Sequence, residues 1–173
     1  VGLQISDGIS AVTQNLNITV EDDSPISGDV YQSLVIPQQN TNLMFIIDTS
    51  GSMGWNAGGG LTRMELLLDS VADVIRSYDD QGDVAIQIAT FSSGSDSSFQ
   101  TNFMAVSEAL AFLGEDGINS PDSLLTPGGG TNYDLAVDAA ESGWAQYGKL
   151  VATPDIPVAN VSYFLSDGQP QTS

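Results

Sequence analysis

Three side chains that carry oxygen alternate directly after an apolar run of the sequence. The run "FIID" ends at Asp48, and Ser50 and Ser52 follow in "TSGS". Alternate side chains of an extended chain point to the same side, so these three can converge on one point. A plain strand-to-helix turn is the alternative, but it needs only the aspartate and the glycine. The two serines at this spacing therefore favour a site for a hard cation.

Two more oxygen-bearing residues are candidates for the same site. Thr131 in "GGGTN" precedes an expected helix, and Asp167 in "LSDG" ends an apolar segment. Mg²⁺ and Ca²⁺ prefer oxygen ligands, and two carboxylates with three hydroxyls leave room for water or for a partner's carboxylate. The glycines at 128–130 would keep side chains away from the ion. Taken singly, Thr131 could be only a helix cap, and Asp167 with Gly168 only a turn.

Apolar and amphipathic segments alternate along the chain and predict the elements that position these residues. Buried strands are expected at 42–48, 82–92 and 159–168, and an edge strand at 97–104. The aromatic Trp55 beside the first motif is either a ligand contact or a cover over the core, and we favour the second interpretation.

Helices are expected between these strands. The first covers 61–78 and begins with a capping box of Thr62 and Glu65, and a short one covers 105–113. The third covers 131–148, with a face of aromatic and small residues that should be buried: Tyr133, Ala136, Ala140, Trp144 and Tyr147.

This order of elements predicts an α/β fold with a doubly wound, mostly parallel sheet. Ligands of such sheets bind beyond the carboxyl ends of the strands, where the strand order reverses. Asp48 and Asp167 end strands at that edge, and Thr131 begins a helix that faces it. The five candidate residues are therefore expected to meet.

Composition excludes several classes of function. The 22 acidic residues against three basic ones give a formal net charge of −19, which repels nucleic acid and anionic membranes and attracts cations. The chain has no cysteine and no histidine, which excludes thiol nucleophiles, Ser-His-Asp triads, disulfides and zinc sites with nitrogen or sulfur ligands. No apolar run is long enough to cross a membrane, so direct membrane insertion is not expected.

The N-terminal part has a different pattern. Residues 1–24 alternate like strands and are expected to be the C-terminal strands of an immunoglobulin-like or cadherin-like repeat, and 25–40 a linker. Carboxylates at the junction, Glu21, Asp22 and Asp23 with Asp7, are candidates for a second site that binds Ca²⁺. A solvated acidic linker is the alternative.

The three motifs "DTSGS", "GGGTN" and "LSDG", in this order, resemble the von Willebrand factor A domain and its metal-ion-dependent adhesion site. The family motif Asp-x-Ser-x-Ser, then Thr, then Asp falls on the five candidate residues: Asp48, Ser50, Ser52, Thr131 and Asp167. The resemblance covers 41–173 and implies a divalent cation, Mg²⁺ or Ca²⁺, that bridges to an acidic group of a protein or glycan. The family continues beyond the last motif, so the domain is expected to be incomplete at its C-terminus.

The N-terminal stretch "NITVEDDSP" is similar to the end of a repeat in bacterial repeats-in-toxin adhesins. That resemblance implies an extracellular protein of the bacterial cell surface, exported by type I secretion. It also implies neighbouring repeats of the same chain as partners and Ca²⁺ at the repeat junctions.

Two other functions stay open. The first is a spacer domain that a metal ion stiffens, with no ligand of its own. The second is Mg²⁺-dependent phosphoryl transfer of the haloacid dehalogenase type, which needs a second aspartate where this chain has Ser50, and a well-placed lysine, of which Lys149 is the only one. We therefore expect a non-catalytic binding module.

Overall fold

The computed structural model describes residues 2–6, 11–15, 39–93 and 99–168. Contacts divide the chain into two units, Val1–Val35 and Ile36–Ser173. In the first unit, β1 (Gly2–Ser6) pairs antiparallel with β2 (Ala11–Asn15). Most of the residues expected to form the repeat and the linker lie outside the described ranges.

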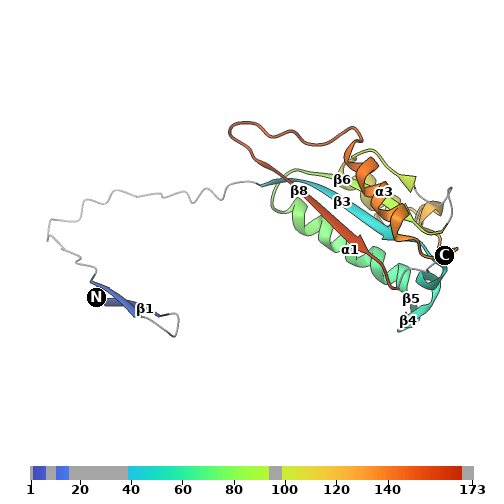
Figure 1. Cartoon of the computed structure of the whole chain (residues 1–173), viewed down its shortest axis with the longest axis horizontal. Helices are drawn as coiled ribbons and strands as arrows, with labels where there is room; N and C mark the ends of the chain where they lie inside the picture. The colour runs from blue at the N-terminus through green and yellow to red at the C-terminus, as the bar shows by residue number, and fades with distance from the viewer. Residues whose placement is uncertain (1, 7–10, 16–38, 94–98, 169–173) are drawn as a thin grey trace. The chain divides into compact units, whose positions relative to one another are not determined.

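A four-stranded sheet forms the centre of the second unit (Figure 1). Its strands are β3 (Asn40–Asp48), β6 (Val84–Phe91), β7 (Phe99–Gln100) and β8 (Val158–Leu165), in the spatial order β7-β6-β3-β8. β3 is parallel to both β6 and β8, and only the short β7 runs antiparallel. The second and third long strands therefore lie on opposite sides of the first, which puts the reversal of strand order at β3.

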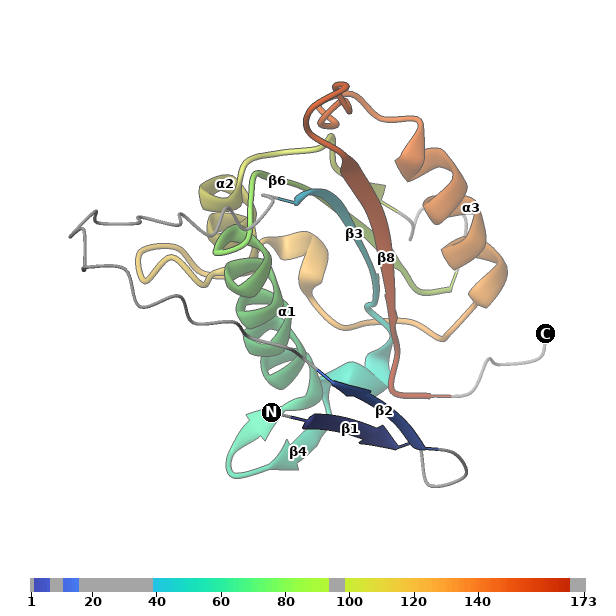
Figure 2. The same ribbon diagram turned by 90° about the vertical axis from the view of Figure 1, so that its left-hand side faces the viewer.

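Helices cover both faces of this sheet (Figure 2). α1 (Arg63–Asp79) and α2 (Val106–Leu113) pack on one face, and α3 (Tyr133–Trp144) packs on the other. The doubly wound, mostly parallel α/β fold expected from the sequence is confirmed. No helix in the described ranges is both long and apolar enough to cross a membrane.

Short elements surround the carboxyl end of β3. The 3-10 helix η1 (Gly51–Gly54) follows it, and β4 (Asn56–Gly58) pairs with β5 (Leu61–Thr62) in a small ribbon. A second 3-10 helix, η2 (Ser123–Leu125), lies in the long loop before α3. The capping box of Thr62 and Glu65 at the start of α1 is confirmed.

The apolar strands are buried because alternate side chains serve both layers. Leu43, Phe45 and Ile47 of β3 pack toward α1 and α2, whereas Met44 and Ile46 pack toward α3. All nine residues of β3 and all eight of β6 are buried, as expected for central parallel strands. This rigid pair fixes the position of the loop that follows β3.

Four details differ from the sequence-based expectation. β8 is only partly buried, and Phe164 is 49% exposed, because β8 pairs only with β3 in the described part of the chain. Tyr147 is exposed, since α3 ends at Trp144. Of the expected edge strand at 97–104, the described residues 99–104 contain β7 and an isolated bridge between Met104 and Ile86. The cap of α3 is Asn132, whose side chain accepts from the backbone of Asp134, and not Thr131.

Candidate functional site

Asp48 is the last residue of β3 and is fully buried. Its Oδ1 accepts a hydrogen bond from the backbone N–H of Ser50 at 2.7 Å, and its Oδ2 accepts one from the hydroxyl of Ser166 at 2.5 Å. Thr49 points the other way, because its hydroxyl donates to the carbonyl of Phe91 on β6 at 3.1 Å. The extended alternation expected from the sequence thus separates Asp48 from Thr49, but it stops before Ser52, which lies in the 3-10 helix η1.

The two serines of the first motif lie side by side. The hydroxyl oxygens of Ser50 and Ser52 are 3.1 Å apart, and Ser50 is 1% exposed. Ser50 occupies the cap position of η1, but its side chain makes no capping hydrogen bond. The plain-turn alternative therefore leaves the orientation of this hydroxyl toward Ser52 unexplained.

Asp167 follows β8 and joins the same group. Its Oδ1 accepts a hydrogen bond from the hydroxyl of Ser52 at 2.8 Å, and its Oδ2 forms an ion pair with the guanidinium of Arg63. Residues 115 positions apart in the chain thus share one hydrogen-bond network.

The glycine loop is attached to the first motif through the backbone. The N–H of Gly51 donates to the carbonyl of Gly129 at 2.9 Å, and the N–H of Gly128 donates to the carbonyl of Thr49 at 2.8 Å. Gly129 has φ of 76°, and a Cβ there would lie 3.0 Å from the hydroxyl of Ser93. Only glycine fits both conditions.

Thr131 follows this loop and is 6% exposed. No hydrogen bond ties its hydroxyl to another residue of the described part, so its place at the site rests on the two backbone bonds of the glycine loop. The structure thus joins Ser50, Ser52 and Asp167 through their side chains and ties the Asp48 carboxylate to Ser50 through the backbone N–H. It brings in Thr131 only through its loop.

The buried carboxylate of Asp48 lacks a positive partner. The chain has three basic side chains, all within the described ranges, and none is paired with Asp48. Arg63 pairs with Asp167, Arg76 pairs with Asp73 and Glu115, and Lys149 donates to the carbonyl of Trp144. Because a buried charge is costly unless it is paired or binds a metal, the donor set fits a divalent cation.

Sequence reasoning missed two residues of this network. Ser166 donates to Asp48 and lies directly before Asp167, so its strand-end position was the available signal. Arg63 is the first residue of α1, and nothing in its local sequence indicated a contact with Asp167. Trp55 is 63% exposed and packs 5.4 Å from the Arg63 guanidinium, so its interpretation as a cover over the core is wrong.

The second candidate site is not described. Asp7, Glu21, Asp22 and Asp23 all lie outside the described residues. Within the described ranges, no group of three or more His, Cys, Asp or Glu side chains is placed to share a metal ion. A cation at the carboxyl end of β3 would therefore use two carboxylates and rely on hydroxyls and water for its other ligands.

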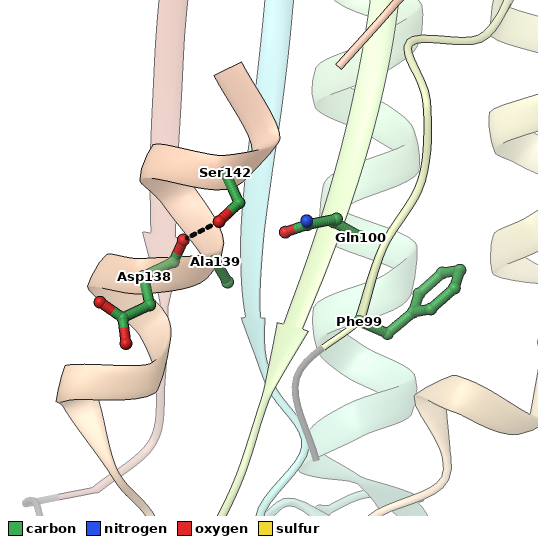
Figure 3. A pocket seen from close by; sticks show the side chains of 5 residues that line it. All are labelled: Phe99, Gln100, Asp138, Ala139 and Ser142. Atoms are coloured by element: carbon green, nitrogen blue, oxygen red, sulfur yellow. Dashed lines mark hydrogen bonds between the residues drawn. The ribbon is translucent and has the colours of Figure 1, made fainter. Parts of the chain in front are cut away.

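A pocket of about 320 Å³ lies elsewhere, between β7 and α3 (Figure 3). Gln100 points toward α3, Phe99 points away from it, and the carboxylate of Asp138 points away from Gln100. The hydroxyl of Ser142 is used within the helix, where it donates to the carbonyl of Asp138 at 2.8 Å. This pocket offers no group of side chains that converge for chemistry.

Comparison with known families identifies the fold. The von Willebrand factor type A domain matches residues 43–156, about two thirds of the chain, and the chain belongs to that family. Domains of this family are typically ligand-binding or adhesion modules. The matched segment contains the first motif and Thr131 but ends before Asp167. No curated protein sequence matches.

Two solved structures share the fold. An aspartate-to-alanine mutant of the PilB minor pilin from Streptococcus sanguinis superposes with a TM-score of 0.57 at 21% identity, over 79% of this chain and 32% of that one. The PilB minor pilin itself gives a TM-score of 0.50 at 18% identity, over 88% and 38%. This chain thus spans about a third of the length of those pilins.

Proposed function

We propose that the second unit is a divalent-metal-dependent adhesion module of a bacterial surface protein. The ion is Mg²⁺ or Ca²⁺, held by Asp48, Ser50, Ser52, Thr131 and Asp167, directly or through water. It binds an acidic group on a protein or glycan partner and catalyses no reaction.

One observation carries this proposal. Asp48 is fully buried, no basic side chain pairs with it, and it accepts from the backbone of Ser50, whose hydroxyl faces that of Ser52. Burying a carboxylate in this way is unfavourable in a protein without a bound cation. A hard cation with oxygen ligands would compensate the charge and use the serine hydroxyls as ligands.

An open coordination position connects the ion to adhesion. Hydroxyls are neutral ligands, so two carboxylates would only balance a divalent ion, and water or a partner's carboxylate would complete its coordination. The surrounding protein carries a formal charge of −19, so a bare acidic ligand would otherwise be repelled.

The location of the protein is part of the same proposal. We place it outside the cell, in a repeats-in-toxin adhesin exported by type I secretion, with neighbouring repeats and a Ca²⁺ site at 7 and 21–23. The acidic composition and the strand-like N-terminal pattern support this location. The shared fold with minor pilins is compatible with it.

Calorimetric titration of Mg²⁺ and Ca²⁺ into chelator-treated protein tests the proposal. We expect binding to the wild type and loss of that binding in Asp48→Asn, which keeps the shape of the side chain and removes its charge. Asp155→Asn is the matched control, because Asp155 is exposed and precedes β8, whose length puts it roughly 25 Å from the site.

Three results would separate the alternatives. Binding that Asp48→Asn leaves intact would place the metal elsewhere and contradict the proposal. Binding at the site with no acidic ligand found by the loaded protein would favour a metal-stiffened spacer. Hydrolysis of a phosphate ester that depends on Asp48 would favour the enzyme alternative.

A further inference from the structure

Arg63 is the cationic side chain that contacts the candidate site directly. Its guanidinium pairs with Oδ2 of Asp167, while Oδ1 of the same carboxylate faces Ser52. The carboxylate is thus divided, with one oxygen toward the hydroxyls of the site and the other toward the arginine. Arg63 can therefore stay in place when the first oxygen turns to a metal ion.

Arg63 is also held in position by its other neighbours. The ring of Trp55 lies 5.4 Å from the guanidinium carbon, at a distance typical of a cation–π contact. The backbone N–H of Arg63 donates to the carbonyl of Trp55 at 2.9 Å. The following helix is fixed by the capping box of Thr62 and Glu65. The side chain is 37% exposed, so it remains accessible from solvent.

The charge at the site depends on this residue. Asp48 and Asp167 carry two negative charges and Arg63 carries one positive charge, so the three together have a net charge of −1. A divalent ion brings this local charge to +1. Without Arg63, the loaded site would be neutral, in a protein whose formal net charge is −19.

We propose that Arg63 sets the charge of the metal-loaded site, so that the domain captures anionic ligands at the expense of metal affinity. This inference rests on the function proposed above and specifies how that site selects its ligand. The guanidinium repels the incoming cation and partly neutralises the carboxylate of Asp167 by pairing with it. Both effects weaken metal binding. The same positive charge attracts a carboxylate that approaches the loaded site.

The proposal predicts effects of opposite sign from a single substitution. In Arg63→Gln, the affinity for Mg²⁺ and Ca²⁺ should rise about five- to ten-fold, while the affinity of the loaded protein for acetate should fall by a similar factor. A merely structural role of Arg63 would lower both affinities together. Arg63→Lys keeps the charge and should restore both affinities most of the way, although it loses the planar contact with Trp55.

The experiment uses two readouts on the same proteins. Calorimetry measures Mg²⁺ and Ca²⁺ affinity of the chelator-treated proteins. Acetate is then titrated into Mg²⁺-saturated, ¹⁵N-labelled protein, and the indole N–H signals of the chain's two tryptophans are followed by NMR. Trp55→Phe assigns the signal of Trp55. Acetamide, the neutral analogue of acetate, serves as the ligand control and should not bind.

Arg76→Gln is the matched protein control. It removes the same charge from the same helix, thirteen residues further along, which is roughly 20 Å away. Arg76 pairs with Asp73 and Glu115, and that distance exceeds the screening length at physiological salt. Arg76→Gln should therefore leave both affinities unchanged, and circular dichroism verifies that each variant is folded.

The possible results distinguish this inference from the proposed function. If the wild type binds metal through Asp48 but Arg63→Gln behaves like Arg76→Gln, the function stands and the role of Arg63 is refuted. The role of Arg63 is also refuted if folded Arg63→Gln binds both the metal and acetate more weakly, or if it binds acetate as tightly as the wild type does. If the wild type binds no metal at Asp48, the proposed function and the inference fall together.

Discussion

Replacing Asp48 by asparagine should stabilise the protein without metal and remove its stabilisation by metal. The carboxylate is fully buried at the end of β3, and no basic side chain pairs with it. Asparagine has almost the same shape. Its oxygen can accept from the N–H of Ser50, and its amide can donate to the hydroxyl of Ser166, so both hydrogen bonds of the site are kept.

The magnitude follows from two opposing terms. Burying an ion without a partner costs several kcal/mol, and the substitution removes that cost. Two hydrogen bonds change from charge-assisted to neutral, which loses about 1 kcal/mol each. The net effect is a stabilisation of about 1–2 kcal/mol, and Tm in the presence of chelator should rise by about 2–8 °C.

Metal should reverse this order. Binding that is selective for the folded protein stabilises it by about 2.7 kcal/mol at a metal concentration of one hundred times Kd. The wild type should gain that amount in Mg²⁺, while Asp48→Asn should gain almost nothing. The two Tm values should therefore cross between chelator and saturating Mg²⁺.

Thermal unfolding followed by circular dichroism measures this in four samples, each protein with chelator and with Mg²⁺. The exposed control Asp155→Asn should match the wild type in both conditions. A lower Tm of Asp48→Asn in chelator would refute the reasoning, since the carboxylate would then be well held without a cation. Equal gains in Mg²⁺ for wild type and Asp48→Asn would show that the metal binds elsewhere.

Two further predictions concern the elements that support the site. Thr62→Ala should cost about 1 kcal/mol in urea unfolding at pH 7, because it removes a cap of α1, and an unchanged midpoint would contradict this. Hydrogen bonds from the backbone and hydroxyl of Thr62 lower the pKa of the Glu65 carboxyl below its ordinary value of 4.5. The stabilisation that the ionised Glu65 adds to the capping box is therefore complete above pH 4.5. It should be lost as the pH falls through the folded pKa, and the difference between wild type and variant should shrink there. Gly129→Ala should cost about 1–2 kcal/mol, because φ is 76° and the hydroxyl of Ser93 lies 3.0 Å from the new Cβ. Gly128→Ala, where a Cβ meets nothing within 4 Å, is its control, and equal losses in both variants would refute the steric argument.

The central strands of the fold were predictable because most of their residues are apolar. β3 and β6 are buried on both faces, and polar residues do not occupy every second position in either strand, as they would in a strand with one exposed face. The helix α1 was predictable from its apolar periodicity and from its capping box. These elements are fixed by local pattern.

Elements at the edge of the sheet were predicted less well, because their burial depends on neighbours in space. The run ending at Leu165 is as apolar as β6, yet β8 has a partner on one side only within the described residues, and Phe164 is half exposed. Tyr147 continues the helical spacing of α3 in sequence, but the helix has ended before it. Apolar spacing does not show where a helix stops.

The ligand candidates were predictable and their partners were not. Asp48 and Asp167 follow from their places at the ends of strands. The extended alternation expected as far as Ser52 is wrong there, because Ser52 lies in the 3-10 helix η1. Arg63 reaches Asp167 from the first turn of α1, across 104 positions of sequence, and only the packed fold brings the two together. The net charge of the site, which includes Arg63, therefore could not be predicted from the sequence.

A crystal structure of the protein with Mn²⁺, a cation that shares the preference of Mg²⁺ for oxygen ligands, would test the proposed metal site most directly. Anomalous scattering would locate the ion without assumption about its ligands. We expect a single strong peak at the carboxyl end of β3, within ligand distance of the hydroxyls of Ser50 and Ser52, with Asp48 and Asp167 bound directly or through water. A well-ordered site without a peak there, or with the peak only at the acidic residues 21–23, would contradict it.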